Sequence, residues 1–337
     1  MSPNFIARHW YHLTPVSVLA YPISLVFRIA VWIRRYLYRA GLLATTRLPV
    51  PVIVVGNLTV GGTGKTPLVI WMVRMLAEAG RKPGVLSRGY GGFANAPRQV
   101  RAEDAAALVG DEPVLLAARC NCPVWIGRDR ARAGAALLSA YPDCDVLVCD
   151  DGLQHYRLAR DIEIAVEDGR GIGNGLMLPA GPLREPADRP VDAHVINCEP
   201  ADAHSTKCDS MRAGAFAMRL EPHGFYLLHD PARTIDAFEL IAKRLHAVAG
   251  IGDPQRFFAQ LSRLGLAPQC HPFPDHHRYS KADLDFQNCD LVLMTEKDAV
   301  KCSQLGRTDL AALRVEANLV PAFGDFILEK LSGLPTA

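Results

Sequence analysis

The chain has 337 residues, of which 49% are hydrophobic and 21% charged, and its formal net charge is +2. This length and composition are typical of a globular protein of about two domains, and the small net charge argues against nucleic acid as a partner. Nine cysteines are scattered without the spacing of a metal site, which predicts reduced thiols in the interior rather than a disulfide framework.

Charge is unevenly distributed along the sequence. No Asp or Glu precedes Glu78, whereas residues 1–77 contain eight Lys or Arg. The rest of the chain holds the other 29 basic residues and all 35 acidic residues. A basic leader without acidic residues is attracted to anionic surfaces such as membranes.

The leader also has a helical pattern. On a helix, residues 16–42 place Arg28, Arg35 and Arg39 on one narrow stripe, with apolar residues on the opposite side. Arg28 interrupts an apolar stretch that is already near the minimum length of a membrane span, and no cleavage site of a signal peptide follows it. We therefore predict an amphipathic helix within residues 1–45 that lies on an anionic membrane surface. The alternative is a helix packed by its apolar face on the protein's own core.

A phosphate-binding loop follows the leader. The aliphatic run at residues 52–55 predicts a strand buried on both faces, and the sequence GNLTVGGTGKTP continues from it into a helix. Its glycines allow several backbone N–H groups to face one anion, Lys65 adds a positive charge, and the Thr66 hydroxyl suits Mg²⁺. The first glycine of the strict motif is replaced by Thr59, but the position between a strand and a helix favours a phosphate site over a chance glycine-rich turn.

Strands and helices alternate after this loop, as in an α/β sheet. The sequence predicts strands at residues 84–87, 124–126, 146–149, 162–166 and 194–197, and helices at 66–79, 114–119 and 129–140. A polar stretch at 199–209 suggests a boundary, after which strands are expected at 215–220, 225–228, 247–250, 267–271 and 291–295. We therefore predict a mostly parallel sheet of the P-loop NTPase type, with helices on both faces, in residues 46–200. A second, smaller α/β domain is expected in residues 201–337.

Acidic side chains occur at the end of one predicted strand and at the start of one predicted helix. Asp150 and Asp151 end an apolar run, and two carboxylates at a strand tip suit a nucleotide-bound Mg²⁺ better than a simple charged turn. Asp111 begins a helix, so it is either an N-cap or a catalytic group, and the sequence leaves both open. The irregular segment 171–186 contains Arg184 and Glu185, which offer a phosphate contact and a metal or substrate contact.

Three further segments contain candidate functional side chains. Residues 88–92 form a basic and aromatic loop at a strand's carboxyl end, where ligands of open α/β sheets bind. In the second unit, residues 273–279 and 295–298 cluster titratable groups next to strands. The paired histidines of the former are, by residue type alone, more often inert than catalytic.

Eight motifs, taken in order, resemble those of the tetraacyldisaccharide 4′-kinase family, the lipid A kinases. They are GNLTVGGTGKTP (56–67), LSRGYGG (86–92), GDEP (110–113), CDDGLQH (149–155), GPLREP (181–186), AGIGDPQRF (249–257), FPDHHRY (273–279) and TEKDAVK (295–301). The resemblance implies transfer of the γ-phosphate of ATP to the 4′-hydroxyl of a tetraacylated glucosamine disaccharide 1-phosphate. It also implies a location on the cytoplasmic face of a Gram-negative inner membrane, with the smaller domain closing over the site.

The same resemblance assigns roles to residues of this sequence. The ATP phosphates would be bound by Thr59, Val60, Gly61, Gly62, Thr63, Gly64, Lys65 and Thr66, and Mg²⁺ by Thr66, Asp150, Asp151 and Glu185. Asp111 would be the general base, with His276 as its partner. The lipid A disaccharide precursor would be contacted by Asn57, Ser87, Arg88, Tyr90 and Arg184. No obligate protein partner is implied.

A membrane-bound switch ATPase of the partitioning type is the alternative function. Such proteins share GGxGKT, but they usually carry a lysine just before the first of those glycines, where this chain has Val60. Phosphorylation of a lipid would distinguish a kinase from such a switch.

Overall fold

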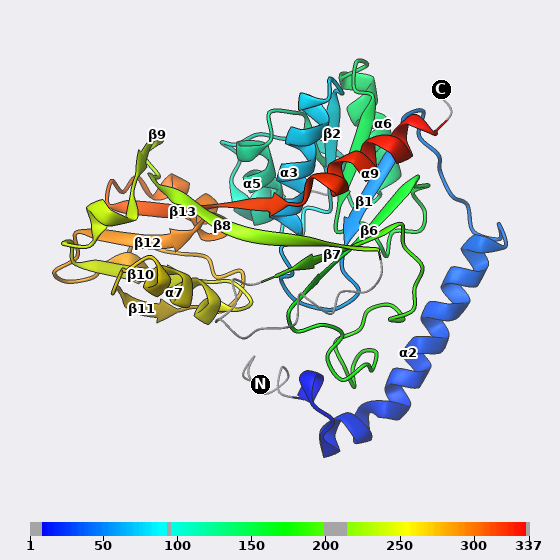
Figure 1. Ribbon diagram of the computed structural model, residues 1–337, viewed down its shortest axis with the longest axis horizontal. Helices are drawn as coiled ribbons and strands as arrows, with labels where there is room; N and C mark the ends of the chain where they lie inside the picture. Colours follow the sequence, from blue (N-terminus) through cyan, green and yellow to red (C-terminus); the bar gives the residue numbers. More distant parts are fainter. Residues whose placement is uncertain (1–8, 93–95, 199–213, 335–337) are drawn as a thin grey trace.

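The computed structural model describes residues 9–92, 96–198 and 214–334 (Figure 1). One sheet of 13 strands runs through the molecule in the order β11-β10-β12-β13-β8-β7-β6-β1-β5-β2-β4-β3, with β9 paired to β8. The pairings of β3 with β4, of β13 with β8 and of β8 with β9 are antiparallel, and all others are parallel. The predicted α/β class with a mostly parallel sheet is therefore confirmed.

The first half of the chain builds one side of the sheet, from β7 to the edge strand β3. They are β1 (Val52–Gly56), β2 (Pro83–Ser87), β3 (Arg98–Val100), β4 (Val124–Ile126), β5 (Val146–Asp150), β6 (Ile162–Asp168) and β7 (Ala193–Asn197). The helices are α3 (Lys65–Glu78), α4 (Ala106–Val109), α5 (Asp111–Arg119) and α6 (Arg130–Ala140). All strands expected here are present, and their ends differ from the prediction by at most two residues, because fully apolar runs mark strands buried on both faces.

Alternate residues of β1 enter two separate cores. Ile53 and Val55 pack with residues of α3 and α5, whereas Val52 and Val54 pack on the other face with residues of α6. This is the alternation of a strand whose two faces are both covered. Helices therefore cover both faces of the first half of the sheet, as predicted.

The second half repeats this architecture on a smaller scale. Its strands are β9 (Asp230–Ile235), β10 (Leu245–Ala249), β11 (Gln269–Pro272) and β12 (Leu291–Thr295), and its helices are α7 (Pro254–Arg263) and α8 (Glu296–Cys302), with short 3₁₀ turns at Ala237–Leu240, Ala282–Leu284 and Ser303–Leu305. Ala247 and Ala249 face one core, and Val248 faces another. The predicted smaller α/β unit is thus present.

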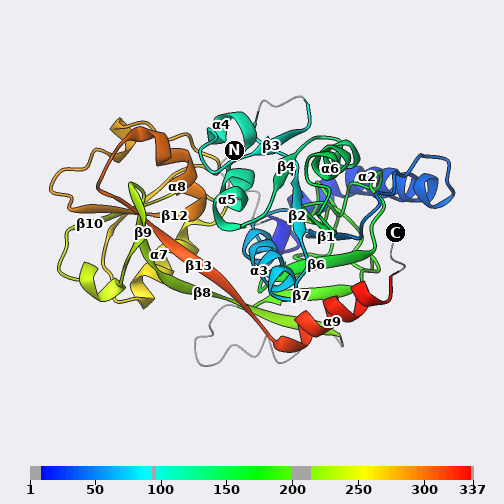
Figure 2. The ribbon, with the colours of Figure 1, turned by 90° about the horizontal axis from the view of Figure 1, so that it is seen from above.

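A long antiparallel ribbon connects the two halves (Figure 2). It consists of β8 (Ala215–Leu227) and β13 (Leu310–Leu319), paired from Met218 with Leu319 to Leu227 with Ala311. The prediction of two separate strands at 215–220 and 225–228 is wrong, because Pro222 and Gly224 lie within one strand. The chain then returns in α9 (Pro321–Ser332), whose Phe323 packs on the core of the first half. The division at residue 200 stays a prediction.

The leader forms α2 (Pro15–Arg39), which lies at one side of the molecule (Figure 1). Ser24 donates a 2.6 Å hydrogen bond to the Met177 carbonyl, and Phe27 packs beside the core. Its outward side is apolar and open, with Leu19 80% and Val26 67% exposed. The alternative of an apolar face packed on the protein's own core is therefore not what the structure shows.

By length and composition α2 is the one helix of the described residues that could cross a membrane. Its most apolar window has a mean hydropathy of 1.9, and 11% of that window is buried. A single such helix near the start of a chain is weak evidence for a span, so its orientation relative to a bilayer stays a prediction.

Cysteines follow the expectation of reduced thiols in the interior only in part, because Cys270 is free but exposed and Cys198 is not a free thiol. Seven of them are free, at positions 120, 122, 144, 149, 270, 289 and 302, and burial raises the pKa of the Cys144 thiol to about 11. Cys198 is disulfide-bonded, so the prediction that all nine are reduced is wrong at that position. Cys208, the other cysteine of this region, lies outside the described residues.

Candidate active site

The phosphate loop lies between the carboxyl end of β1 and the start of α3. Its carbonyls accept hydrogen bonds from three side chains, one within the loop and two outside it: from Asn57 Nδ2 to Gly61 (3.1 Å), from Arg170 Nη2 to Gly62 (3.1 Å) and from Asn197 Nδ2 to Thr63 (3.2 Å). In a trans peptide the N–H points opposite to the C=O. The next amides along the chain are therefore turned to the other side of the loop, as a phosphate cradle requires.

Glycine is required at two places in the loop. Gly61 and Gly64 have φ of 119° and 92°, in the region that other residues avoid. A Cβ on Gly64 would lie 2.8 Å from Asn197 Nδ2. In contrast, the amide of Val60 donates to the Pro182 carbonyl at 2.9 Å, so this amide is not available to a phosphate.

Lys65 of the loop forms an ion pair with Asp151. Lys65 Nζ lies 3.7 Å from Asp151 Oδ1, and Arg184 Nη1 donates to the same oxygen at 3.1 Å. Burial raises the pKa of Asp151, but Lys65 and Arg184 outweigh burial and hold this pKa below its usual value. Asp151 is therefore ionised and holds both cations beside the loop. Thr66, in the first turn of α3, is half-buried.

Asp150 is the side chain that best fits a metal. It ends β5, is 1% exposed, and neither of its carboxylate oxygens has a hydrogen-bond partner among the described residues. Burial and the nearby Glu112 carboxylate raise its pKa to about 7, against the opposing effect of Lys65. A buried carboxylate without a partner is costly unless a cation compensates it.

Glu185 does not join this group. Its Oε1 accepts a 2.7 Å hydrogen bond from the Tyr156 hydroxyl and lies 3.6 Å from Arg189 Nη1. Among the described residues no three His, Cys, Asp or Glu side chains gather closely enough to hold a metal by themselves. The structure therefore does not bring Glu185 together with Asp150 and Thr66.

Residues expected to contact the acceptor fall into two groups. Asn57 and Arg184 are joined, with Arg184 Nη1 donating to Asn57 Oδ1 at 3.2 Å next to the phosphate loop. Ser87 is buried at the end of β2. Arg88 is exposed and makes no hydrogen bond or ion pair with the described residues. The Tyr90 ring is 62% exposed and its centroid lies 5.5 Å from that of His276.

Asp111 and His276 are in direct contact. His276 Nδ1 lies 2.9 Å from Asp111 Oδ2, although the two residues belong to different halves of the molecule. The hydrogen bond to Asp111 raises the pKa of His276, whereas burial and Lys297 lower it. Gly110 occupies the N-cap of α5, and Asp111 makes no capping bond. The capping role that the sequence left open is therefore excluded.

A buried network holds the loop that carries His276. The His276 amide donates to the Gly250 carbonyl at 3.2 Å, and His276 itself has φ of 59°. Asp298, fully buried, accepts from the Gly250 amide at 3.1 Å and pairs with Lys301 Nζ at 2.6 Å. Lys301 also donates to the Gly250 carbonyl at 3.3 Å. The TEKDAVK segment thus fixes Gly250 from both sides and, through it, the backbone of His276.

Sequence reasoning missed several residues of the site. Lys297 Nζ lies 3.3 Å from Glu112 Oε1 and 3.8 Å from Asp275 Oδ1, and so joins the neighbours of Asp111 and His276. The charged TEKD motif was noticed, but nothing in its spacing showed which carboxylates it would meet. Arg170 and Asn197, which hold the phosphate loop, carry no local motif at all.

Known proteins resemble the chain over nearly its whole length. The family model Tetraacyldisaccharide-1-P 4′-kinase matches residues 16–332. Proteins named tetraacyldisaccharide 4′-kinase are 50% identical in Azoarcus sp. (strain BH72), over 98% of this chain and 96% of that protein, and 46% identical in Methylobacillus flagellatus, over 98% and 97%.

A solved structure gives the same result for the fold. The "apo" form of LpxK from Aquifex aeolicus, in complex with ATP, superposes with a TM-score of 0.80 at 28% identity. The match covers 94% of this chain and 99% of that one. Sequence and fold therefore resemble the same group of proteins.

Proposed function

The chain belongs to the tetraacyldisaccharide-1-P 4′-kinase family and transfers the γ-phosphate of ATP to the 4′-hydroxyl of a lipid A disaccharide precursor. We propose that it does so with the groups at the carboxyl ends of β1 and β5. The observation that carries this assignment is the Asp111–His276 contact. It lies close to the phosphate loop, since Glu112, next to Asp111, and Lys65 of the loop both act on the carboxylate of Asp150. Phosphoryl transfer demands mainly positioning and charge neutralisation, together with a group that accepts the hydroxyl proton.

The phosphates of ATP bind to the loop between Gly61 and Thr66. Its inward amides and the Lys65 ammonium supply the positive field, and Asp151 orients Lys65 and Arg184 towards the same place. Thr66 and Asp150 are the residues that would hold Mg²⁺, because Asp150 is a buried carboxylate whose oxygens lack partners. Such an ion neutralises charge on the β- and γ-phosphates. In this proposal Glu185 is not one of the ligands, because Tyr156 and Arg189 engage its Oε1 and it forms no cluster with Asp150 and Asp151, although its buried Oε2 has no partner among the described residues.

Asp111 accepts the proton of the 4′-hydroxyl. Oδ1 of Asp111 makes no hydrogen bond with the described residues, while His276 holds Oδ2. The imidazole fixes the orientation of the carboxylate and shares its proton. Tyr90, whose ring lies against His276, contacts the sugar ring next to the reacting hydroxyl.

The lipid acceptor reaches this site from a membrane on which α2 lies. The exposed apolar side of α2 supports this arrangement, since a surface of that kind is stabilised by burial at the acyl boundary. Because ATP is consumed, the protein works on the cytoplasmic face of the bacterial inner membrane, as a peripheral enzyme.

The test is the mass of the lipid product. Purified protein is incubated with ATP, Mg²⁺ and the tetraacylated disaccharide 1-phosphate in neutral detergent micelles, and the lipid is extracted and weighed by mass spectrometry. We expect a product heavier by one phosphate, and we expect Lys65→Ala to abolish nearly all of it while the thermal unfolding curve is kept. ATP hydrolysis on vesicles without a phosphorylated lipid would instead identify a switch ATPase.

A further inference from the structure

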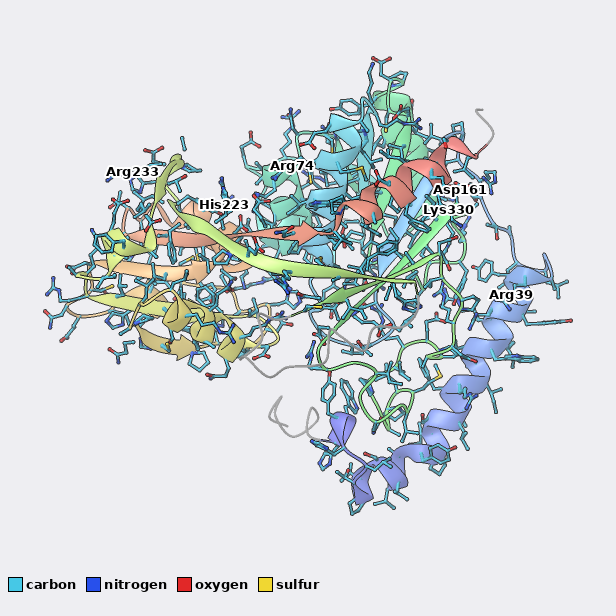
Figure 3. The ribbon with its side chains drawn as sticks, viewed as in Figure 1. Arg39, Arg74, Asp161, His223, Arg233 and Lys330 are labelled. Atoms are coloured by element: carbon cyan, nitrogen blue, oxygen red, sulfur yellow. The ribbon has the colours of Figure 1, made fainter. Side chains whose placement is uncertain are left out.

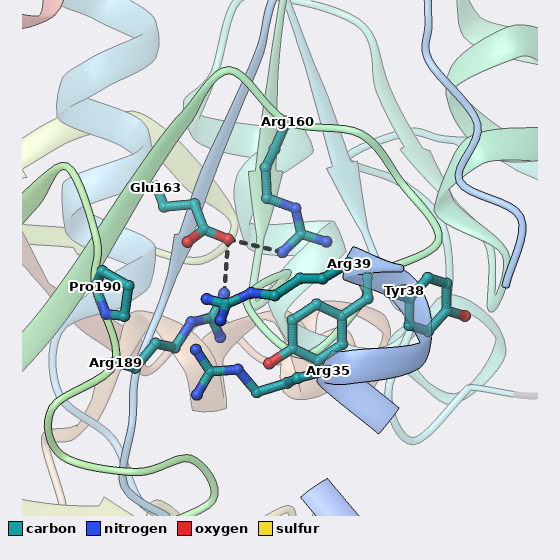
Figure 4. A pocket seen from close by; sticks show the side chains of 8 residues that line it. Arg35, Tyr38, Arg39, Arg160, Glu163, Arg189 and Pro190 are labelled. Atoms are coloured by element: carbon teal, nitrogen blue, oxygen red, sulfur yellow. Dashed lines mark hydrogen bonds and ion pairs between the residues drawn. The ribbon is translucent and has the colours of Figure 1, made fainter. Parts of the chain in front are cut away.

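A cationic cavity lies where the last turns of α2 meet the body of the protein. Its volume is about 230 Å³, and it is separate from the phosphate loop. Side chains of α2, of the connection between β5 and β6, of β6 itself and of the segment before β7 line it (Figure 4): Arg35, Tyr38, Arg39, Tyr156, Arg160, Glu163, Arg189 and Pro190.

Positive charge in this cavity is compensated only in part, by Glu163 and by Glu185, which lies 3.6 Å from Arg189 and does not line the cavity. Four of the lining groups are guanidinium groups and one is a carboxylate, Glu163. Glu163 Oε1 already accepts from Arg189 Nη2 at 2.6 Å and from Arg160 Nη1 at 3.0 Å. Arg35 and Arg39 make no hydrogen bond or ion pair with the described residues, and Figure 4 shows both beside the paired arginines. Such a concave group of like charges favours an anion.

The two inner arginines are rigid. Arg189 is buried, and its Nη1 donates to the Leu153 carbonyl at 3.0 Å. Arg160 donates to the carbonyls of Leu153 and Leu158. Both side chains also lie over the Tyr156 ring, at 5.3 and 5.5 Å from its centroid. An anion entering the cavity therefore meets a wall that is already ordered, with the two α2 arginines free to close on it.

Aromatic residues place this cavity near a membrane interface. Trp32 and Tyr36, in the same part of α2 as Arg35 and exposed, stack with their ring centroids 5.7 Å apart. Exposed Trp and Tyr settle at the level of lipid headgroups. Figure 3 shows Arg39 on the last turn of the same helix. When the apolar side of α2 lies in the acyl boundary, the cavity is at headgroup level.

We propose that this cavity binds the phosphate of a membrane lipid, with Arg35 and Arg39 closing on it from α2 and Arg160 and Arg189 behind it. Guanidinium groups bind phosphate oxygens by paired charge-assisted hydrogen bonds, which a diffuse surface charge does not supply. The proposal rests on the membrane location of α2 argued above. The phosphate has two possible sources: a bilayer phosphodiester lipid, and the 1-phosphate of the acceptor.

Vesicle binding tests the first source without any need for catalysis. The full-length protein is titrated, without ATP, with vesicles of phosphatidylcholine alone and of phosphatidylcholine with phosphatidylglycerol. Arg28→Gln is the matched control, since Arg28 is exposed on the same helix and does not line the cavity. Loss of one surface charge should weaken binding to the anionic vesicles by about fivefold. We expect Arg35→Gln to weaken it by about tenfold or more, because hydrogen bonds are also lost.

Arg35→Lys and Arg39→Gln extend the series. Arg35→Lys keeps the charge but not the planar fork, so it should bind more weakly than the wild type if the site is specific. Arg39→Gln repeats the test at an exposed position where folding is not at risk. Unfolding curves and the KM for ATP should be unchanged in all variants.

The KM for the acceptor in neutral detergent micelles tests the second source. A rise in Arg35→Gln but not in Arg28→Gln assigns the cavity to the acceptor's phosphate; an unchanged KM with selective loss of vesicle binding assigns it to a bilayer lipid. The proposal is overturned if Arg35→Gln, Arg39→Gln and Arg28→Gln behave alike in both assays. A failure of lipid phosphorylation by the wild type would refute the proposed kinase and leave the vesicle result standing.

Discussion

The contact between Asp111 and His276 joins the first residue of α5 to the loop after β11, which belongs to the opposite half of the chain. If the pair is one catalytic unit, Asp111→Ala should lower kcat by roughly 10² to 10⁴, the usual range for loss of a positioned base, with little change in the KM for ATP. His276→Ala should lower kcat less, and the double variant should be only slightly worse than Asp111→Ala. The measurement is kcat of the three variants at saturating ATP and lipid. Fully multiplicative losses would mean that the residues act independently.

Among the single residues of the site, the sequence predicted those that belong to a local motif. The phosphate loop, Asp150 and Asp151 could be found because each follows a strand that its own apolar run predicts. Asn197 and Arg170 hold the same loop from more than 100 residues away, and no spacing in the sequence connects them to it. The role of Glu185 as a metal ligand comes from the resemblance to the kinase family and stays a prediction, and its contacts with Tyr156 and Arg189 follow from no local motif.

Helix α2 is the element whose orientation decides how the protein meets its substrate. The periodicity of the sequence identified an apolar side and an arginine stripe, but it could not say which side faces the protein. Ser17 and Ser24 are buried, and Arg35, on the same side of the helix, lines the cavity. The side of the helix that carries Ser17, Ser24 and Arg35 therefore faces the protein, Arg28 stays exposed, and the apolar side is the one left for lipid.

Substitutions on that outward side should separate attachment from chemistry. Leu19→Asp and Val26→Asp place a charge where a bilayer would be contacted, so each should lower affinity for phospholipid vesicles by about tenfold or more. The KM for the lipid should rise while the KM for ATP stays constant. Vesicle sedimentation and steady-state kinetics provide the two readouts. Phe238→Asp, at an exposed apolar residue of the other half, is the control and should change neither; unchanged sedimentation of the α2 variants would refute the membrane role.

Over the whole molecule, the sequence predicted two α/β units but not their continuity. Local patterns show where strands begin and end, whereas the pairing of β8 with β13 joins residues about 90 apart, which only the folded chain reveals. Helix α9 illustrates the same limit, because it follows the second unit in sequence and packs on α3 of the first, with Trp71 and Phe323 centroids 5.6 Å apart. The β8–β13 pairing and the packing of α9 on α3 therefore both connect the two halves of the molecule.

Two ion pairs join α5 of the first half to α8 of the second beside the catalytic pair. Arg119 pairs with Glu296 at the buried end of α5, and Lys297 pairs with Glu112 at the end that carries Asp111. Lys297 also lies near Asp275, the neighbour of His276. We predict that Lys297→Met lowers kcat by about tenfold, the effect of losing one positioning ion pair, while Lys297→Arg keeps most of the activity. Lys243→Met, at an exposed lysine of the same half, should have no effect.

The pH profile distinguishes this positioning role from a general loss of stability. A proton bound to His276 prevents the pair from accepting another, so kcat should fall as the pH drops through the pKa of His276. The hydrogen bond to Asp111 raises that pKa, and the charge of Lys297 lowers it. Lys297→Met should therefore move the acid limb of the profile to higher pH, whereas Asp111→Asn should move any residual limb to lower pH. If Lys297→Met lowers kcat equally at every pH, Lys297 does not act on His276, and its ion pairs serve only to hold the two halves together.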